Sequence, residues 1–161
     1  MKRLIIFILP LFYFGSYGQS PLDVGEKQFN AGLGFSDNGI PIYVGADFGV
    51  AQNITLGAEL SYRNIGDQGF DLNTLGLVGI FDYHLDELLS LSPEWNVYAG
   101  ANAGFYFVGS PSGYSGNQDS EFGFGLQVGS RYFFSDRLAA NLQLGGGSKV
   151  NDGRLGISLL F

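Results

Sequence analysis

Apolar and polar residues alternate along most of the chain between residues 27 and 161. From Phe29 to Phe35, for example, every second position is apolar, and the positions between are asparagine or glycine. A period of two places successive side chains on opposite faces and therefore predicts a β-strand. The pattern predicts about eight strands in all, at 27–35, 42–50, 54–63, 72–84, 95–107, 121–131, 138–145 and 155–161.

The strand predicted at 72–84 is the least regular of the eight. Val78 and Ile80 fall among the positions that alternate with Leu75, Leu77 and Phe81, so both faces carry apolar side chains. The pattern leaves the register of this strand open.

The two faces of the other strands differ in composition. One face is apolar, whereas the opposite face is mostly Gly, Asn, Gln, Ser and Tyr. A water-exposed sheet face is expected to be rich in charged residues and threonine, while small polar residues suit the crowded interior of a narrow barrel. Aromatic residues also fall near strand ends, as in the girdles of membrane barrels: Tyr62, Tyr83, Trp95, Phe107, Tyr132 and Phe134. We therefore predict an all-β fold, an antiparallel up-and-down transmembrane β-barrel.

The connections between the predicted strands have two lengths. Turns at 51–53 and 135–137 are short, whereas polar segments at 64–71 and 109–120 are longer. Membrane barrels have short periplasmic turns and longer outer loops, so both termini are predicted to be periplasmic. The connection 85–94 is an exception, because it makes a long periplasmic turn.

The N-terminus has the features of a secretory signal peptide. Lys2 and Arg3 precede the apolar run 4–14, and small residues follow it up to Gly18. That run is shorter than the ~20 residues that a membrane-spanning helix needs. We predict a signal peptide at 1–18, a short N-terminal segment at 19–26 and the barrel at 27–161.

Composition narrows the functional classes. The 161-residue chain has 8 basic and 15 acidic residues, and loss of Lys2 and Arg3 with the signal leaves a net charge of −9. Such a charge disfavours nucleic acid as a partner. No cysteine is present, so the chain has neither disulfides nor the lipid-modified cysteine of a lipoprotein.

Three segments carry a resemblance to a known family: 44–62 (VGADFGVAQNITLGAELSY), 97–107 (VYAGANAGFYF) and the terminal GISLLF at 156–161. In these the chain resembles the small eight-stranded outer-membrane barrels of the OmpX and OmpA-barrel type, and the resemblance covers the whole mature chain. It implies an integral outer-membrane protein in contact with lipid and lipopolysaccharide. It also implies that Phe161 is part of an assembly signal, read by the barrel-insertion machinery.

Five charged residues fall on the face predicted to line the barrel: Asp47, Glu59, Arg63, Glu121 and Arg131. Buried charges are costly unless they are paired, so we predict that these residues form a charge network in the lumen. An eight-stranded barrel is just wide enough to be filled by side chains, which favours a structural network over an ion path. Tyr43, Tyr98 and Tyr106 are expected to occupy the same space.

Other candidate residues give weaker signals. His84 is the single histidine and has no nearby serine before Ser90, so a surface or turn histidine is expected rather than a catalytic base. No metal-ligand spacing is present, and no catalytic residue or cofactor is predicted. Four acidic residues are expected in outer loops, as solvated charges or as contacts for divalent cations or partner proteins: Asp67, Asp71, Asp119 and Asp152. Lys149 and Arg154 flank the last loop and could touch lipopolysaccharide phosphates.

Three functions fit these observations. The first is a non-enzymatic outer-membrane barrel that contributes to envelope integrity or presents its outer loops to an extracellular partner. The second is a narrow channel, whose conductance would change on substitution of Arg131 or Glu59. The third is a soluble, lipocalin-like ligand barrel, which would require the apolar face to point inward.

Overall fold

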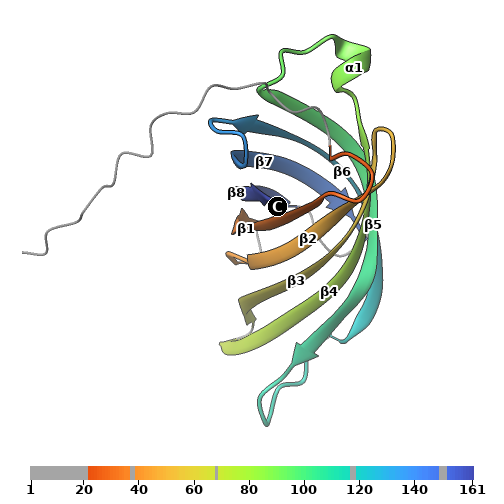
Figure 1. Cartoon of the computed structure of the whole chain (residues 1–161). Helices are drawn as coiled ribbons and strands as arrows, with labels where there is room; N and C mark the ends of the chain where they lie inside the picture. Colours follow the sequence, from red (N-terminus) through yellow and green to blue (C-terminus); the bar gives the residue numbers. More distant parts are fainter. Residues whose placement is uncertain (1–21, 37–38, 68, 117–118, 149–151) are drawn as a thin grey trace, which may run out of the picture.

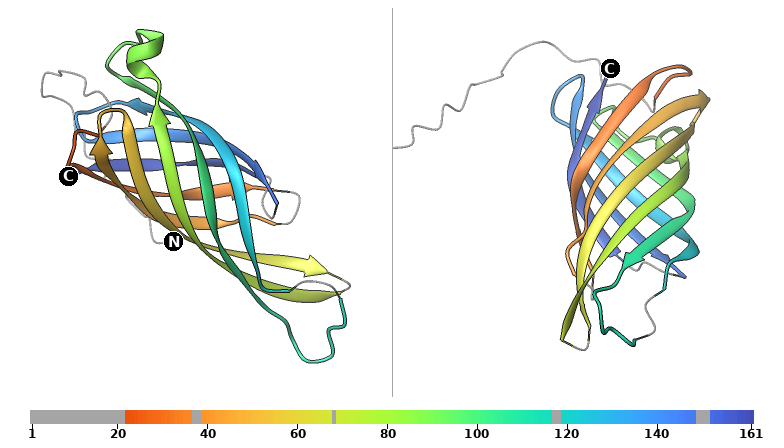
Figure 2. Two further views of the ribbon diagram at one scale, coloured as in Figure 1. Left: turned by 90° about the vertical axis from the view of Figure 1, so that its right-hand side faces the viewer. Right: turned by 90° about the horizontal axis from the view of Figure 1, so that it is seen from below.

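The computed structural model describes residues 22–36, 39–67, 69–116, 119–148 and 152–161, and the predicted signal peptide at 1–18 lies outside them. Eight antiparallel strands pair in chain order, and the last strand pairs with the first, which closes the barrel (Figures 1 and 2). This confirms the predicted fold class. The strands are β1 (Lys27–Phe35), β2 (Ile42–Ala51), β3 (Ile54–Asp67), β4 (Phe70–His84), β5 (Trp95–Gly109), β6 (Glu121–Phe133), β7 (Leu138–Gly147) and β8 (Asp152–Leu160).

One short helix, α1 (Asp86–Leu89), interrupts the connection between β4 and β5. It lies at the end of the barrel that carries the C-terminus, which we call the inner end (Figure 2). The turns β2–β3 and β6–β7 lie at the same end. Within the described part of the chain, no helix is long and apolar enough to cross a membrane.

The predicted polar loop at 64–71 is wrong. β3 and β4 continue through it and pair as far as Asp67 and Phe70, so they form a hairpin that extends beyond the neighbouring strands at the outer end (Figure 2, left). Ile65 and Leu72 lie opposite each other in this extension, and both are buried. The burial of this apolar pair favours strand pairing over the loop that the polar composition suggested.

The register of β4 follows from its two neighbours. Val78 pairs with Glu59 of β3 and Gly104 of β5, and its side chain is buried in the lumen, as Thr74 and Asp82 are. Leu75, Leu77 and Phe81 therefore point outward and are exposed. β4 alternates like the other strands, but its inner face includes aliphatic residues.

The glycines of the inner face make room for three tyrosines. Tyr43, Tyr98 and Tyr106 are all buried in the lumen. A β-carbon at Gly129 would collide with the Tyr98 ring, and one at Gly76 would crowd Tyr106. Glycine on the adjacent strand thus leaves the space that each large ring occupies.

The outer face of the barrel is a continuous apolar surface. Most of its leucine, isoleucine, valine and phenylalanine side chains are 40–70% exposed, including Leu77 at 56% and Leu126 at 70%. Trp95 and Tyr132, near the inner end, are in ring contact at 5.0 Å. An exposed apolar band bordered by aromatic residues is the exterior of a barrel that is surrounded by lipid.

Candidate functional site

The centre of the lumen is an ion pair that spans the barrel. Arg131 of β6 donates through Nη2 to Asp47 Oδ2 at 3.0 Å, and both side chains are about 95% buried. β2 and β6 are four strands apart in a ring of eight, so this contact joins opposite walls. Charge pairs that are buried in this way need further hydrogen bonds to offset the cost of removing both ions from water.

Neighbouring side chains supply these further contacts to Arg131. Its Nη1 donates to Asn96 Oδ1 at 3.0 Å, and the guanidinium lies over the Tyr98 ring at 4.3 Å. Gln28 makes a further contact with the guanidinium. With its side-chain amide oriented so that the oxygen faces Arg131, this oxygen accepts a hydrogen bond from Nε at 3.0 Å. The guanidinium therefore has polar or aromatic partners from three other strands.

On the other side of the ion pair, hydrogen bonds continue across β1, β8 and β7. Asn30 donates to Asp47 Oδ2 at 2.8 Å and accepts from Ser158 Oγ at 2.7 Å. Asn141 donates to the same Ser158 oxygen at 2.9 Å and accepts from Tyr43 OH at 2.9 Å. The buried pair is thus linked to a polar network that crosses half of the barrel.

A second ion pair joins Glu59 of β3 to Arg154 of β8. Arg154 Nη1 lies 2.6 Å from Glu59 Oε1, and the guanidinium is 5.3 Å from the Tyr43 ring centroid. Arg154 was expected to flank the last outer loop and to touch lipopolysaccharide phosphates; instead, β8 begins at Asp152 and directs Arg154 into the lumen, where it pairs with Glu59. Lys149, the other basic residue expected to flank that loop, lies outside the described residues.

The five charges predicted to line the lumen lie at different depths in the structure. Asp47 and Arg131 pair with each other, while Glu59 pairs with a residue that was not predicted to face inward. Arg63 is partly exposed in the outer half of β3, and Glu121 is exposed at the outer end of β6. These two charges therefore lie closer to the outer end of the barrel than Asp47, Glu59 and Arg131 do.

His84 is buried, which contradicts the expected surface or turn position. The Asn96 amide donates to His84 Nδ1 at 2.8 Å and to Asp86 Oδ2 at 2.6 Å. His84 Nδ1 is therefore an acceptor, so Nε2 carries the proton and donates to Thr55 Oγ1 at 3.1 Å. Both ring nitrogens are occupied by neutral partners, and this geometry leaves no nitrogen directed at a substrate.

Asp86 lies at the inner end of the lumen network and is buried. It is the first residue of α1, and its Oδ1 accepts from the backbone N–H of Val97 at 2.6 Å. Burial raises the pKa of the Asp86 carboxyl above its usual value. Asp86 thereby ties the β4–β5 connection to the polar network of the lumen.

Several residues of this network were not among the five charges predicted to form it: Asn30, Asp82, Asp86, Asn96, Gln127 and Asn141. Most lie on the inward positions of their strands, so the alternation itself was the available signal. Asp82, for example, accepts from Gln127 at 2.7 Å, but its orientation followed only from the register of β4. In the part of the chain that the structure describes, no three His, Cys, Asp or Glu residues are grouped to hold a metal ion.

A second group of contacts orders the outer end. The Tyr114 hydroxyl, in the β5–β6 connection, donates to Asp67 Oδ2 at 2.5 Å, and its ring meets Phe70 edge-on at 5.8 Å. Asp67 and Phe70 lie at the tip of the β3–β4 hairpin. The hairpin and the longest connection are therefore packed together into one outer structure, visible at the lower right of Figure 2, left.

Comparison with known proteins shows similarity in structure but not in sequence. No family model matches the chain, and no curated protein matches it significantly. The outer membrane protein OprG from Pseudomonas aeruginosa has a TM-score of 0.65 at 10% identity, covering 87% of this chain and 97% of OprG. Ail from Yersinia pestis, determined in a phospholipid bilayer nanodisc, has a TM-score of 0.57 at 12% identity, covering 85% and 99%.

A de novo designed transmembrane β-barrel is similar to the same degree, with a TM-score of 0.57 at 19% identity and coverage of 86% and 98%. The chain thus has the fold of the small eight-stranded outer-membrane barrels, as the resemblance implied. Because a designed barrel matches as well as Ail does, the fold by itself carries no particular activity.

Proposed function

We propose that this protein is a non-enzymatic, integral outer-membrane barrel that holds an ordered outer structure at the cell surface. The observation that carries the proposal is the contrast between the two faces of the wall. The outside is apolar and exposed, whereas the inside is crossed by the Arg131–Asp47 ion pair and its hydrogen bonds. A ligand-carrier barrel in water would need the opposite arrangement.

The outer structure is the part through which such a barrel would act on its surroundings. Tyr114 joins the β5–β6 connection to the tip of the β3–β4 hairpin by a short hydrogen bond and a ring contact. A closed barrel without free strand edges is a rigid support for these segments. Surface interaction through them, or a contribution to envelope integrity, is the activity that this geometry supports best.

Labelling in intact cells tests the proposed location and orientation. The chain has no cysteine, so Ser112→Cys, in the exposed β5–β6 connection, creates a single reactive thiol. We expect a membrane-impermeant maleimide to label this variant in intact cells of a Gram-negative host. The matched variant Ser135→Cys, exposed in the β6–β7 turn, should react only after the outer membrane is permeabilised. Labelling of both variants or of neither in intact cells would contradict the proposal.

The lumen contacts also predict that the barrel does not conduct. Reconstituted in a planar bilayer, the wild-type protein should show no discrete openings, because Arg131, Tyr98 and the hydrogen-bonded residues around them cross the lumen. A porin inserted in the same bilayer is the positive control. Steady openings of the wild-type protein, altered by Arg131→Ala or Glu59→Ala, would instead support the narrow channel.

A further inference from the structure

The short helix α1 carries two exposed leucines at the inner end of the barrel. Leu88 and Leu89 are 76% and 51% exposed, and Leu88 is the most exposed of the large apolar side chains in the described residues. α1 does not cover the barrel opening. It lies outside the ring of strands in Figure 1, and the left view of Figure 2 shows it beside the wall, at the end that carries the C-terminus.

The two acidic residues of α1 fix its orientation. Asp86 points into the barrel, where it binds the Val97 N–H and the Asn96 amide, both at 2.6 Å. Glu87 accepts from Asn53 at 3.0 Å and from Gln52 at 3.2 Å, and so attaches α1 to the β2–β3 turn. With both carboxylates held by the barrel rim, the apolar half of the helix is left at the surface.

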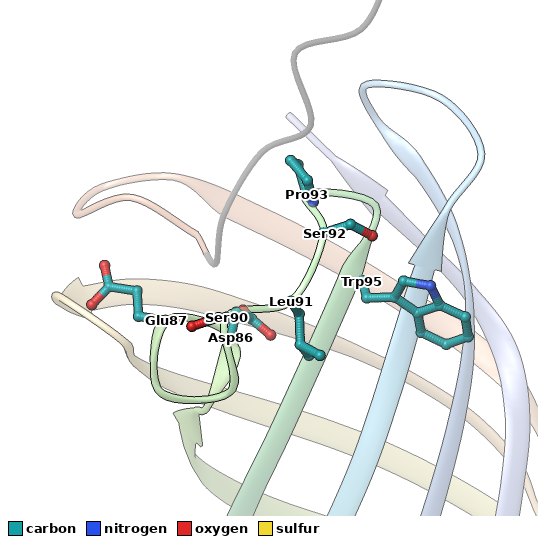
Figure 3. A pocket seen from close by; sticks show the side chains of 7 residues that line it. All are labelled: Asp86, Glu87, Ser90, Leu91, Ser92, Pro93 and Trp95. Atoms are coloured by element: carbon teal, nitrogen blue, oxygen red, sulfur yellow. The ribbon is translucent and has the colours of Figure 1, made fainter.

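The part of the connection that follows α1 reaches the aromatic border of the outer face. Figure 3 shows the residues that line a hollow in this connection, among them Leu91 and, at the start of β5, Trp95. Trp95 is in ring contact with Tyr132, and both are exposed on the outer face of the barrel. Tryptophan and tyrosine at such positions lie at the level of the lipid headgroups.

We infer that the β4–β5 connection is an interfacial anchor, in which Leu88 and Leu89 insert into the inner leaflet of the bilayer beside the barrel. The inference rests on the proposed membrane location of the barrel. A side-on apolar segment next to an aromatic girdle has the geometry of an element that lies in the membrane interface. The segment 85–94 contains Asp86, Glu87 and Glu94 and no basic residue, so the occupant is a zwitterionic phospholipid surface, bound through apolar contact rather than charge.

Spin labelling in phosphatidylcholine vesicles tests the anchor. A nitroxide is attached to the single cysteine of Leu88→Cys, and its collisions with oxygen, which concentrates in lipid, are compared with those with a water-soluble nickel chelate. Leu77→Cys, exposed at the middle of β4, is the lipid reference, and Ser135→Cys, exposed in the β6–β7 turn, is the water reference. Leu89→Cys repeats the measurement at the neighbouring position.

We expect the ratio of oxygen to nickel collisions at Leu88 to lie well above that at Ser135 and toward that at Leu77, with no dependence on salt concentration. A ratio equal to that of Ser135 at both leucines would overturn the anchor. Few collisions with either reagent would also overturn it, because they would show a protein surface, such as a second copy, over α1. If the Leu77 label itself is in water, the membrane location of the barrel fails, which is a different result from failure of the anchor alone.

Discussion

Replacing Arg131 by methionine should destabilise the barrel by about 3–5 kcal/mol, the usual cost of removing one partner from a buried ion pair. The Asp47 carboxylate would remain buried, with the Asn30 amide as a neutral partner, and Tyr98 would lose its cation contact. Reversible urea unfolding in phospholipid vesicles, followed by the fluorescence of the single tryptophan, measures this change. Arg137→Met removes the same charge from an exposed turn and should change the free energy of unfolding by no more than about 0.5 kcal/mol.

A variant without either charge distinguishes two contributions to the free energy of unfolding: the cost of burying one unpaired ion and the net stabilisation by the ion pair. Asp47→Leu combined with Arg131→Met leaves no uncompensated charge, so its destabilisation should be smaller than that of Arg131→Met alone. Equal destabilisation in the single and double variants would show that packing around the guanidinium matters more than its charge. A loss below about 1 kcal/mol in Arg131→Met would contradict a closed, dry environment for this pair.

The second large effect is expected on the outer face. Leu126 lies at the middle of β6 and is 70% exposed. If the outer face were exposed to water, Leu126→Arg would hardly change the free energy of unfolding, because residue 126 is largely exposed and the substitution would disturb no packed neighbour. At the midplane of a bilayer, the same change should cost about 2–4 kcal/mol.

The control for this prediction is the same substitution at a different depth in the membrane. Phe122 lies on the same face of β6, near its outer end, and is exposed to a similar degree. Phe122→Arg should cost only about 0–1 kcal/mol, because an arginine near the interface reaches water. Unfolding titrations of both variants in the same vesicles make the comparison, and equal costs at the two depths would contradict a membrane-spanning orientation.

The alternation of side chains was enough to predict the barrel, because a period of two defines strands and their faces wherever one face is uniformly apolar. The bounds of β1 were predicted as observed, and the predicted inward positions of Tyr43, Tyr98 and Tyr106 are occupied by buried side chains. The alternation predicts least where both faces of a strand carry apolar residues. In β4, Val78 and Ile80 face the lumen although they are apolar, so only pairing with β3 and β5 established the register.

The connections show the same limit. The segment 64–71 is polar and was predicted as a loop, yet it forms the end of a hairpin. Composition reports how polar a segment is, whereas the pairing of Ile65 with Leu72 depends on two strands meeting in register. The sequence also could not predict the position of α1 beside the wall, because that position depends on contacts of Asp86 with β5 and of Glu87 with the β2–β3 turn.

The sequence by itself thus determined the strands, their two faces and the set of residues available to the lumen, because these follow from the local period of the chain. Only the tertiary structure decided which of these residues meet. Asp47 and Arg131 are 84 residues apart, and Glu59 and Arg154 are 95 apart. Their pairing depends on how closure of the barrel sets the height and direction of each strand, and this is a property of the whole ring rather than of any segment.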